Sequence, residues 1–360
     1  MKKVLFWVLH RPDRSPSQRF RFEQYLSYLK ENGYDYDYSY LINKEDDKVF
    51  YGSGNYLKKL KILLKSIWKR YTELSKAKRY DLVFIQRECF MLGTAWFEKR
   101  MAKKTKMIFD FDDAIWLHAI SDGNKALAFL KDASKTERII KAAHLVFAGN
   151  DYLADYARKF NPNVVVIPTT VNTDLFIRHP QPQRAAICIG WSGSFSTIPH
   201  FESCLESLRI IKAKYGDKVY FKVIGDGNYK NEELNIKGIP WTAEDEVSQL
   251  SELEIGLMPL PDDIWTRGKC GLKGLCYMSL GVATIMSPVG VNTQIIQDGV
   301  NGFLASTVGE WVDKISLLVD DANLRKKLGT AGRQTVLDNY SAHSQKKNYL
   351  KYFDELCLNS

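Results

Sequence analysis

Apolar and polar positions along the chain alternate between short runs rich in β-branched and aromatic residues and longer stretches with helical spacing. Five apolar runs in the first half each predict a buried strand: KVLFWVL from Lys3, YDLVFIQ from Tyr80, KMIFDF from Lys106, HLVFAG from His144 and VVVIP from Val164. Stretches with helical spacing lie among them, at 19–32, 56–77 and 127–143. Strands that alternate with helices in this way are typical of α/β layering around a parallel sheet.

A second, similar series begins after a polar segment that contains two prolines. This segment, TDLFIRHPQPQR at 173–184, is typical of a hinge or linker. Four further apolar runs follow it: AAICIGW from Ala185, VYFKVIG from Val219, EIGLMPL from Glu254 and ATIMSP from Ala283. We therefore predict two doubly wound α/β domains, over 1–178 and 179–340. A final helix over 341–360 follows, and the pattern leaves open whether it crosses back to the N-terminal domain.

Length and composition narrow the class of protein. A chain of 360 residues that is 45% hydrophobic and 26% charged is typical of a folded globular protein. No apolar stretch approaches the ~20 residues of a membrane-spanning helix. The apolar run at the start is too short for a signal peptide and no small-residue cleavage site follows it, so we expect a cytosolic protein. The six cysteines and six histidines have no metal-binding spacing, which argues against a metalloenzyme.

The net charge of +9 is concentrated in one segment. Residues 57–79 contain nine Lys and Arg and the single acid Glu73, which accounts for eight of the nine excess charges. Because the rest of the chain is close to neutral, and no nucleic-acid module is recognisable, we do not expect nucleic-acid binding.

The same segment has an amphipathic pattern. Apolar residues share one side of the predicted helix: Leu57, Leu60, Leu64, Ile67, Trp68, Tyr71 and Leu74. Four lysines lie on the adjacent side: Lys58, Lys61, Lys65 and Lys69. This pattern is typical of a helix that lies on an anionic membrane surface. It is equally typical of a helix whose apolar side packs on its own domain while the lysines are solvated.

Residues that follow the strands are the candidates for chemistry, because ligands of doubly wound folds bind outside the carboxyl ends of the strands. The segment GWSGSFSTIPHF starts at Gly190 and turns from a strand into a helix. Its small residues Ser192, Gly193 and Ser194 allow close approach of a ligand, and their N–H groups would face an anion at the helix N-terminus. An ordinary serine-capped helix start has the same pattern.

A second candidate begins at Asp262, with the sequence DDIWTRGKCGLKGLCYMSL. It places cations among glycines just before a helix: Arg267, Lys269 and Lys273 with Gly268, Gly271 and Gly274. Positive charge, close backbone approach and a helix N-terminus are what a diphosphate requires. A flexible, solvated basic loop is the alternative interpretation.

From Gly190 onward, the chain resembles the C-terminal, donor-binding domain of retaining GT-B glycosyltransferases, specifically glycosyltransferase family 4. The resemblance is carried by the Gly-Ser turn, VIGDG at 223–227, GLMPL at 256–260 and the segment GLKGLCYMSLGVATIMSPVGVNTQIIQDGVNGFLA at 271–305. It extends more loosely over the N-terminal half, through FDFDDAIW, AGNDYLADYA and VIPTTVNTDLF.

The resemblance implies a GT-B fold of two Rossmann-like domains that face a cleft. It also implies retaining transfer of a sugar from a nucleotide-diphosphate donor to a glycan or lipid-linked acceptor in surface polysaccharide assembly, without a metal or other cofactor. The implied donor side comprises Ser192, Gly193, Ser194, Gly225, Asp226, Trp241, Lys269, Gly271, Leu272, Lys273 and Cys276, with Lys273 also in a catalytic role.

The chain departs from the family at two positions of the donor loop, and near Ser192, where the family has a phosphate-binding arginine. Many members have two glutamates eight positions apart in this segment, and these fall on Gly268 and Cys276 here. The second glutamate usually meets the donor ribose, so Cys276 puts that contact in doubt. Lys269 and Lys273 resemble a variant subgroup with a K-C-x-L-K donor loop, and we expect them to neutralise the phosphates.

Two segments are candidates for the acceptor side. In FDFDDAIW, Asp110 and Asp112 follow a strand and would face the acceptor or the donor sugar as catalytic groups; a capping cluster is the alternative. The Asp-x-Asp metal site of GT-A transferases is disfavoured, because it belongs to a one-sheet architecture. In HRPDRSPSQRFRF, His10, Arg19 and Arg21 would meet acceptor phosphate, or form a solvated basic surface. Rival functions are a GT-B-type sugar-nucleotide epimerase or phosphorylase, or a non-catalytic paralogue that binds sugar nucleotides.

Overall fold

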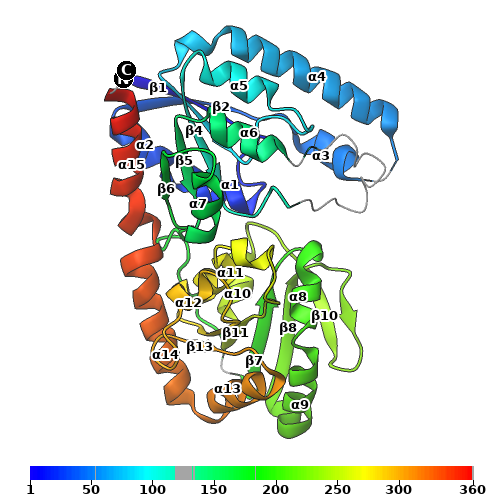
Figure 1. The fold of residues 1–360 in the computed structure, drawn as a ribbon. Coiled ribbons are helices and arrows are strands. Elements are labelled where there is room, and N and C mark those ends of the chain that lie inside the picture. The colour runs from blue at the N-terminus through cyan, green and yellow to red at the C-terminus, as the bar shows by residue number, and fades with distance from the viewer. Residues whose placement is uncertain (53, 118–131, 133, 183, 359–360) are drawn as a thin grey trace. The chain divides into compact units, whose positions relative to one another are not determined.

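The computed structural model describes residues 1–52, 54–117, 132, 134–182 and 184–358. The chain divides into two compact units, of which the first comprises Met1–Pro168 with Lys346–Ser360 and the second comprises Thr169–Gln345 (Figure 1). The first boundary therefore lies before the one expected at residue 178. The polar segment 173–184 belongs to the second unit rather than joining the two.

The first unit contains a six-stranded sheet in the order β2-β1-β3-β4-β5-β6, and every pair in it is parallel. The strands are β1 (Lys2–Trp7), β2 (Tyr34–Ser39), β3 (Leu82–Gln86), β4 (Lys106–Phe111), β5 (Leu145–Ala148) and β6 (Val164–Val166). Five of them coincide with predicted apolar runs. β2 was missed because its sequence, YDYDYS, alternates tyrosine with polar residues, as is common in an edge strand that has one solvated face.

The helices of this unit are α1 (Pro16–Arg21), η1 (Glu23–Tyr25), α2 (Leu26–Glu31), α3 (Lys44–Tyr51), α4 (Tyr56–Ser75), η2 (Ala77–Arg79), α5 (Trp96–Ala102), α6 (Ser134–Ala142) and α7 (Asp151–Arg158). The helix predicted over 19–32 is interrupted at Phe22, whose φ of −143° is not helical. The helix predicted over 127–143 is observed as α6, and residues 127–131 and 133 of that prediction lie outside the described residues.

The final helix, α15 (Ala342–Leu358), contributes aromatic side chains to the core of the first unit. The Tyr349 ring stacks on Tyr25 with 4.4 Å between centroids, and the Phe353 ring stacks on Phe84 at 6.0 Å. Such aromatic pairs add stability beyond the area they bury. The crossing of this helix to the N-terminal domain, left open by the sequence, is therefore observed.

The second unit contains a seven-stranded sheet in the order β13-β12-β11-β7-β8-β10-β9, in which all pairs are parallel except β9 with β10. The strands are β7 (Ile187–Ser192), β8 (Val219–Gly225), β9 (Lys230–Asn231), β10 (Ile236–Pro240), β11 (Ile255–Met258), β12 (Ala283–Met286) and β13 (Phe303–Leu304). The four predicted runs correspond to β7, β8, β11 and β12.

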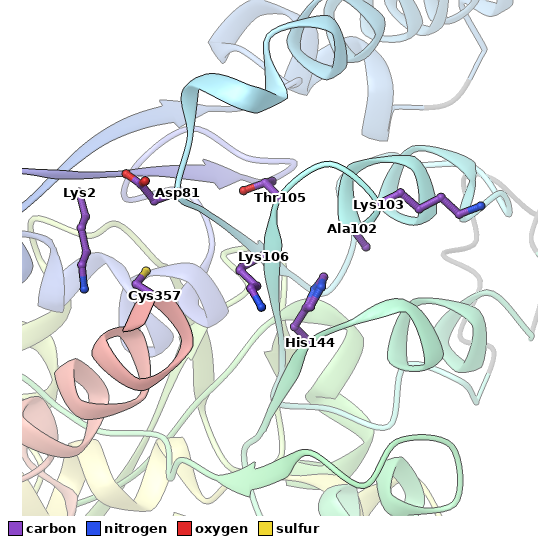
Figure 2. A pocket seen from close by; sticks show the side chains of 8 residues that line it. All are labelled: Lys2, Asp81, Ala102, Lys103, Thr105, Lys106, His144 and Cys357. Carbon is purple, nitrogen blue, oxygen red and sulfur yellow. The ribbon is translucent and has the colours of Figure 1, made fainter. Parts of the chain in front are cut away.

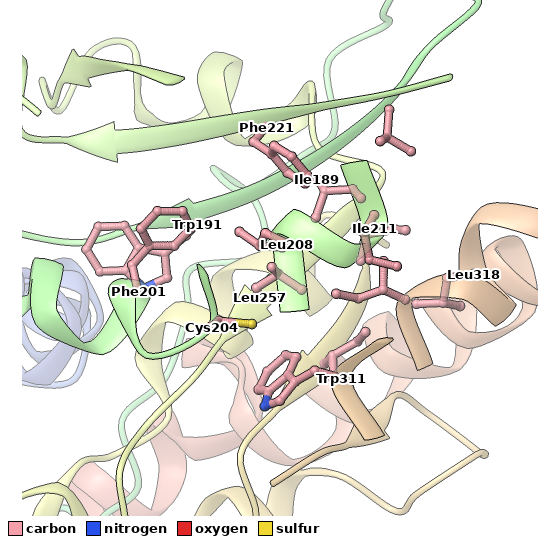
Figure 3. Close-up of a cluster of buried hydrophobic side chains, with 14 of the residues drawn as sticks. Ile189, Trp191, Phe201, Cys204, Leu208, Ile211, Phe221, Leu257, Trp311 and Leu318 are labelled. Carbon is pink, nitrogen blue, oxygen red and sulfur yellow. The ribbon is translucent and has the colours of Figure 1, made fainter. Parts of the chain in front are cut away.

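The helices of the second unit are η4 (Phe195–Thr197), α8 (Ile198–Glu202), α9 (Leu205–Tyr215), η5 (Gly216–Lys218), α10 (Glu246–Ser251), η6 (Thr266–Gly268), α11 (Leu272–Ser279), α12 (Asn292–Ile295), α13 (Val308–Asp320), α14 (Ala322–Thr335) and η7 (Val336–Tyr340). Its core packs Trp191 and Phe221 from the strands with Leu208 from α9 and Trp311 from α13 (Figure 3). Within the described part of the chain, no helix is long and apolar enough to cross a bilayer.

Candidate active site

The end of β7 and the helix α11 are joined in the second unit by Tyr277. The backbone N–H of Ser192 donates to the Tyr277 hydroxyl at 2.7 Å, and the two hydroxyl oxygens lie 3.0 Å apart. Tyr277 is fully buried on α11, and burial raises the pKa of its phenol, which therefore stays protonated. A Cβ atom at Gly256 would lie 2.5 Å from the Tyr277 ring, so glycine in β11 makes room for it. This contact brings the two segments singled out in the sequence together.

Lys273 lies one helical turn before Tyr277 on the same side of α11, since residues four apart are neighbours on a helix surface. Its Nζ atom lies 5.2 Å from the centroid of the Trp191 ring. Trp191 itself is fully buried in the core, where its ring lies 5.7 Å from that of Phe201 (Figure 3). The attraction between the ammonium and the ring therefore holds Lys273 beside the end of β7.

Gly225, at the end of β8, packs directly against the turn that follows β7. The Gly193 N–H donates to the carbonyl of Ile224 at 2.8 Å. A Cβ atom at Gly225 would lie 1.4 Å from the Gly193 carbonyl oxygen, and Gly225 has a φ of +133°. Only glycine fits this close approach of two backbones. The glycine of VIGDG is thus explained by the packing of the turn.

The N–H groups of this turn are used within the protein. Ser192 and Gly193 donate as described, and Ser194 donates to the Thr197 side chain at 3.1 Å in a capping box. The prediction that these three groups face an anion is therefore wrong, because the hydrogen bond to Tyr277, the contact with β8 and the helix cap consume them. The serine-capped helix start, the alternative interpretation, is the one observed.

The N-terminus of α11, unlike the turn after β7, has the properties of an anion-binding site. Its N-cap, Gly271, has a left-handed φ of +70°, and a Cβ atom there would lie 2.3 Å from the side chain of Ile295. The first turn contains the half-buried Leu272 and Lys273, and N–H groups in a first turn have no partner within their own helix. Just before it, the Lys269 Nζ atom lies 5.0 Å from the centroid of the Trp265 ring. A helix N-terminus with nearby lysines favours a bound anion.

Three further residues were predicted to contact the sugar-nucleotide donor: Asp226, Trp241 and Cys276. Asp226 directly follows β8 and accepts a hydrogen bond from the Asn228 N–H at 2.9 Å. Trp241 directly follows Pro240, the last residue of β10, which is paired with Gly225, the last residue of β8. Asp226 and Trp241 therefore both lie at the carboxyl ends of their strands. Cys276 is only 3% exposed and offers almost no surface to a ribose, which corrects its assignment as a direct donor contact.

In the first unit, Arg21 and Asp110 form a fully buried ion pair. The Arg21 Nη2 atom donates to Asp110 Oδ1 at 2.5 Å, and its Nε atom lies 3.1 Å from the same oxygen. Arg21 also donates to the carbonyl of Ile167. Neither side chain has any exposed surface. The expectation that Arg21 and Asp110 contact a sugar or a phosphate is therefore wrong. The pair joins α1 to β4 and positions the residues around it.

Asp112, two residues further on, is less enclosed. It accepts hydrogen bonds from the Ser17 hydroxyl at 2.6 Å and from Arg87 at 3.0 Å. Burial raises the pKa of its carboxyl, but the charges of Arg87 and Arg21 and the Ser17 hydrogen bond outweigh this, so the pKa lies below its usual value. Asp112 is therefore ionised at neutral pH.

Arg87, at the carboxyl edge of the first sheet, is a residue that sequence reasoning missed. It follows β3 directly, pairs with Asp112 and lies 3.5 Å from an Asp113 oxygen. Its φ of +61° is rare for a residue with a long side chain and is associated with functional sites. Arg87 directly follows the predicted strand YDLVFIQ, so the rule that ligands bind after strands could have identified it.

His10 and Arg19 also lie near this edge. The His10 Nε2 atom is 3.3 Å from the Tyr51 hydroxyl. Burial, together with the positive charge of Arg14, lowers the pKa of His10 to about 4, so its imidazole is neutral at pH 7. Arg19 is half-buried and lies over the Phe20 ring, 5.1 Å from its centroid.

Two cavities lie at the other edge of the first sheet. The larger, of about 380 Å³, is lined by residues near the amino ends of β1, β3, β4 and β5 and by Cys357 (Figure 2). A second, of about 320 Å³, shares Lys103 and His144 with it. Neither cavity is lined by a residue that the sequence predicted to belong to the site. Among the described residues, no group of three or more His, Cys, Asp and Glu side chains is arranged to hold a metal ion.

Comparison with known proteins bears on both units. Residues 186–321 match the family model described as "Glycosyl transferases group 1". The chain is similar to the structure of a glycosyltransferase from Rickettsia africae ESF-5, with 16% identity, a TM-score of 0.70 and coverage of 100% of this chain and 99% of that one. It is similar to a sucrose-phosphate synthase from Thermosynechococcus elongatus, with 12% identity, a TM-score of 0.71 and full coverage of both chains.

A third similar structure is that of HepE from Anabaena in complex with UDP-glucose. Its identity is 11% and its TM-score 0.67, and the likeness covers 99% of this chain and 100% of that one. No curated protein sequence matches the chain.

At these identities the solved structures show the fold, and the fold class predicted from the sequence is confirmed. The family match extends over β7, the Gly193 turn and α11, and it supports glycosyl transfer as the activity. The chain therefore has the GT-B fold of two parallel-sheet α/β units, and its residues 186–321 match the family model of the glycosyl transferases group 1.

Proposed function

We propose that the protein is a glycosyltransferase of the hexosyltransferase type. It moves a sugar from a nucleotide-diphosphate donor to a glycan or lipid-linked acceptor, with retention of anomeric configuration, in surface polysaccharide assembly. The observation that carries the proposal is the position of Lys273, in the first turn of α11 and beside the end of β7. The complexes of the similar protein HepE with UDP and with UDP-glucose support a nucleotide-sugar donor.

The central task in this reaction is to stabilise the departing diphosphate. Lys273 and Lys269 supply positive charge, and the first turn of α11 supplies N–H donors and the positive end of a helix. These groups are held by Trp191, Trp265 and the Gly271 cap before any ligand binds, so little reorganisation accompanies the reaction. As the bond to the diphosphate lengthens, the sugar acquires oxocarbenium character.

The other groups have supporting roles in the proposal. Asp226 and Trp241, after β8 and β10, would contact the ribose or the base of the donor. On the acceptor side, Asp112 is ionised and His10 is neutral at pH 7, so each can accept a proton or a hydrogen bond from a hydroxyl. The Arg21–Asp110 pair positions Ser17 and Asp112 through α1 and β4.

Product analysis tests the proposal. The protein is incubated with UDP-sugars and GDP-sugars and with glycan or lipid-linked acceptors, and the products are separated and their anomeric configuration is determined by NMR. The expected product is a glycoside with the anomeric configuration of the donor. An epimerised sugar nucleotide or a sugar phosphate without glycoside would support the epimerase or phosphorylase alternative. Binding without any product would indicate a non-catalytic paralogue.

Metal ions are expected to be dispensable for turnover. Two lysines and a helix N-terminus neutralise the diphosphate here, as a divalent cation does at other diphosphate sites. The initial rate in excess EDTA should therefore equal the rate without EDTA. Loss of activity in EDTA, with recovery on addition of magnesium or manganese, would contradict this. It would also return Asp112, which is less enclosed than Asp110, to consideration as a metal ligand.

We further propose that the protein works in the cytoplasm and associates peripherally with the inner face of the membrane, where lipid-linked acceptors would be presented.

A further inference from the structure

The helix α4 buries a polar side and exposes an apolar one. Its buried residues are Lys59, Ile62, Ser66, Arg70 and Leu74. Its exposed residues include Leu57 and Trp68, which are 84% and 71% exposed, and also Tyr56, Leu60, Leu64, Ile67 and Tyr71. The alternative in which the apolar side packs on its own domain is therefore wrong, except for Leu74.

Hydrogen bonds hold α4 in this orientation. The fully buried Arg70 donates to the carbonyls of Val8 and Cys89 and to the Ser39 hydroxyl, and it pairs with Glu73 at 2.8 Å. Turning the apolar side inward would leave this guanidinium without its partners, which is strongly unfavourable for a buried charge. The exposure of the apolar side is thus a property of the folded unit.

The apolar surface continues from α4 onto α5. The Trp96 ring, 41% exposed, stacks on Tyr71 with 6.2 Å between centroids and 8° between planes. The two helices lie along one another at the outer side of the first unit (Figure 1). We name the surface formed by Leu57, Leu60, Leu64, Trp68, Tyr71 and Trp96 the α4 patch. A contiguous exposed apolar surface of this kind marks an interaction site.

Exposed lysines border the α4 patch. Lys58, Lys61 and Lys65 are all exposed, and the Lys65 side chain retains 65% of its surface despite an ion pair with Asp46. The single acid of α4, Glu73, is directed inward, where it accepts hydrogen bonds from Trp7 and Ser39. The exposed charge on α4 is therefore positive.

Lys69, which the sequence placed with these lysines, is directed elsewhere. Its ammonium donates to the Tyr40 carbonyl at 2.6 Å, and burial lowers its pKa. The set that can meet a partner is therefore Lys58, Lys61 and Lys65.

We propose that the α4 patch docks on an anionic lipid surface, with α4 parallel to the membrane plane. The 20 residues of α4 extend roughly 30 Å along that plane. Leucines would enter the boundary between headgroups and acyl chains, Trp68 and Trp96 would lie at headgroup level, and the three lysines would meet lipid phosphates. Docking of a second copy is disfavoured because it would bring two sets of lysines together. The proposal assigns a surface to the peripheral membrane association proposed above and rests on it, but it does not depend on the transferase activity.

Co-sedimentation of the full chain with vesicles tests it. Vesicles of phosphatidylcholine alone are compared with vesicles that also contain phosphatidylglycerol, at low and at high salt. We expect binding only to the anionic vesicles, weakened by salt because counterions screen the lysines. The triple variant Lys58→Gln, Lys61→Gln, Lys65→Gln should bind at least ~10-fold more weakly. The double variant Leu64→Gln, Trp68→Gln should lose binding similarly, and because both residues are exposed it should remain folded.

A matched control removes the same charge elsewhere. Lys230, Lys326 and Lys327 are exposed in the second unit, and their replacement by glutamine should leave vesicle binding unchanged. Equal binding to neutral vesicles, no binding at low salt, or an equal loss in this control would overturn the proposal. So would a dimer that the Leu64→Gln, Trp68→Gln variant converts to monomer while neither protein binds vesicles. Donor binding, measured on the same variants, reports separately on the second unit.

Discussion

Replacing Lys273 with alanine is expected to reduce turnover by ~10²–10³-fold, the loss typical when one charge-stabilising donor is removed from an active site. The diphosphate gains negative charge as the sugar departs, and Lys273 is the cation that lies in the first turn of α11 beside β7. A contact that strengthens during the reaction lowers kcat as well as kcat/KM when it is lost. The variant should remain folded, because the lost contact with Trp191 stabilises by only ~0.5–1 kcal/mol.

Two variants make this result specific. Lys273→Arg keeps the charge and should recover part of the rate, whereas Lys326→Ala removes an exposed lysine of the same unit and should have no effect. Turnover at the wild-type rate in a folded Lys273→Ala protein would contradict the assignment of Lys273 to the diphosphate.

Replacing Arg21 with alanine is expected to destabilise the protein by ~3–5 kcal/mol, because it leaves the Asp110 carboxylate buried without its partner. Both side chains have no exposed surface, and Arg21 also loses its bond to Ile167. Urea denaturation measures the change, and it is monitored in parallel by tryptophan fluorescence and by far-UV circular dichroism, whose transitions coincide when unfolding is two-state.

The neighbouring Arg19 provides the control. It is half-buried over Phe20, and Arg19→Ala should cost no more than ~1 kcal/mol. The double variant Arg21→Met, Asp110→Leu, which replaces the pair by apolar side chains, should be more stable than Arg21→Ala. If Arg21→Ala were as stable as Arg19→Ala, the ion pair would not have the role that its burial indicates.

The sheets were largely predictable, because central strands of a parallel sheet are buried on both faces and read as continuous apolar runs. This holds for β1, β3 and β4 in the first unit and for β7 and β8 in the second. The short strands β9 and β13, with two residues each, have too few positions to produce a pattern.

The segments of the candidate site were also predictable, from glycines and lysines placed after strands, but their connections were not. Tyr277 lies in an apolar helix and reads as a core residue, yet its hydroxyl meets Ser192, 85 positions away. Trp191 likewise reads as the end of a buried strand, and its contact with Lys273 depends on the packing of α11. Contacts of this kind arise from tertiary structure and leave no local signal.

The orientation of α4 illustrates another limit. An amphipathic pattern shows that a helix has two unlike sides, and burial of the apolar side is the usual outcome. Here Arg70 donates to acceptors just after β1, on β2 and after β3, and these hydrogen bonds fix the opposite orientation. The pattern alone could not identify those acceptors.

Donor binding by the full chain is the most direct test of the central claim, that the N-terminus of α11 beside β7 binds a nucleotide diphosphate. Thermal unfolding is measured with UDP, GDP and their sugars, for the wild type, Lys273→Ala and Lys326→Ala. A ligand at 100 times its dissociation constant stabilises a protein by about 2.7 kcal/mol. We predict that at least one of these nucleotides raises the Tm of the wild type and of Lys326→Ala, and raises that of Lys273→Ala much less. No shift with any nucleotide, or an equal shift in Lys273→Ala, would contradict the claim.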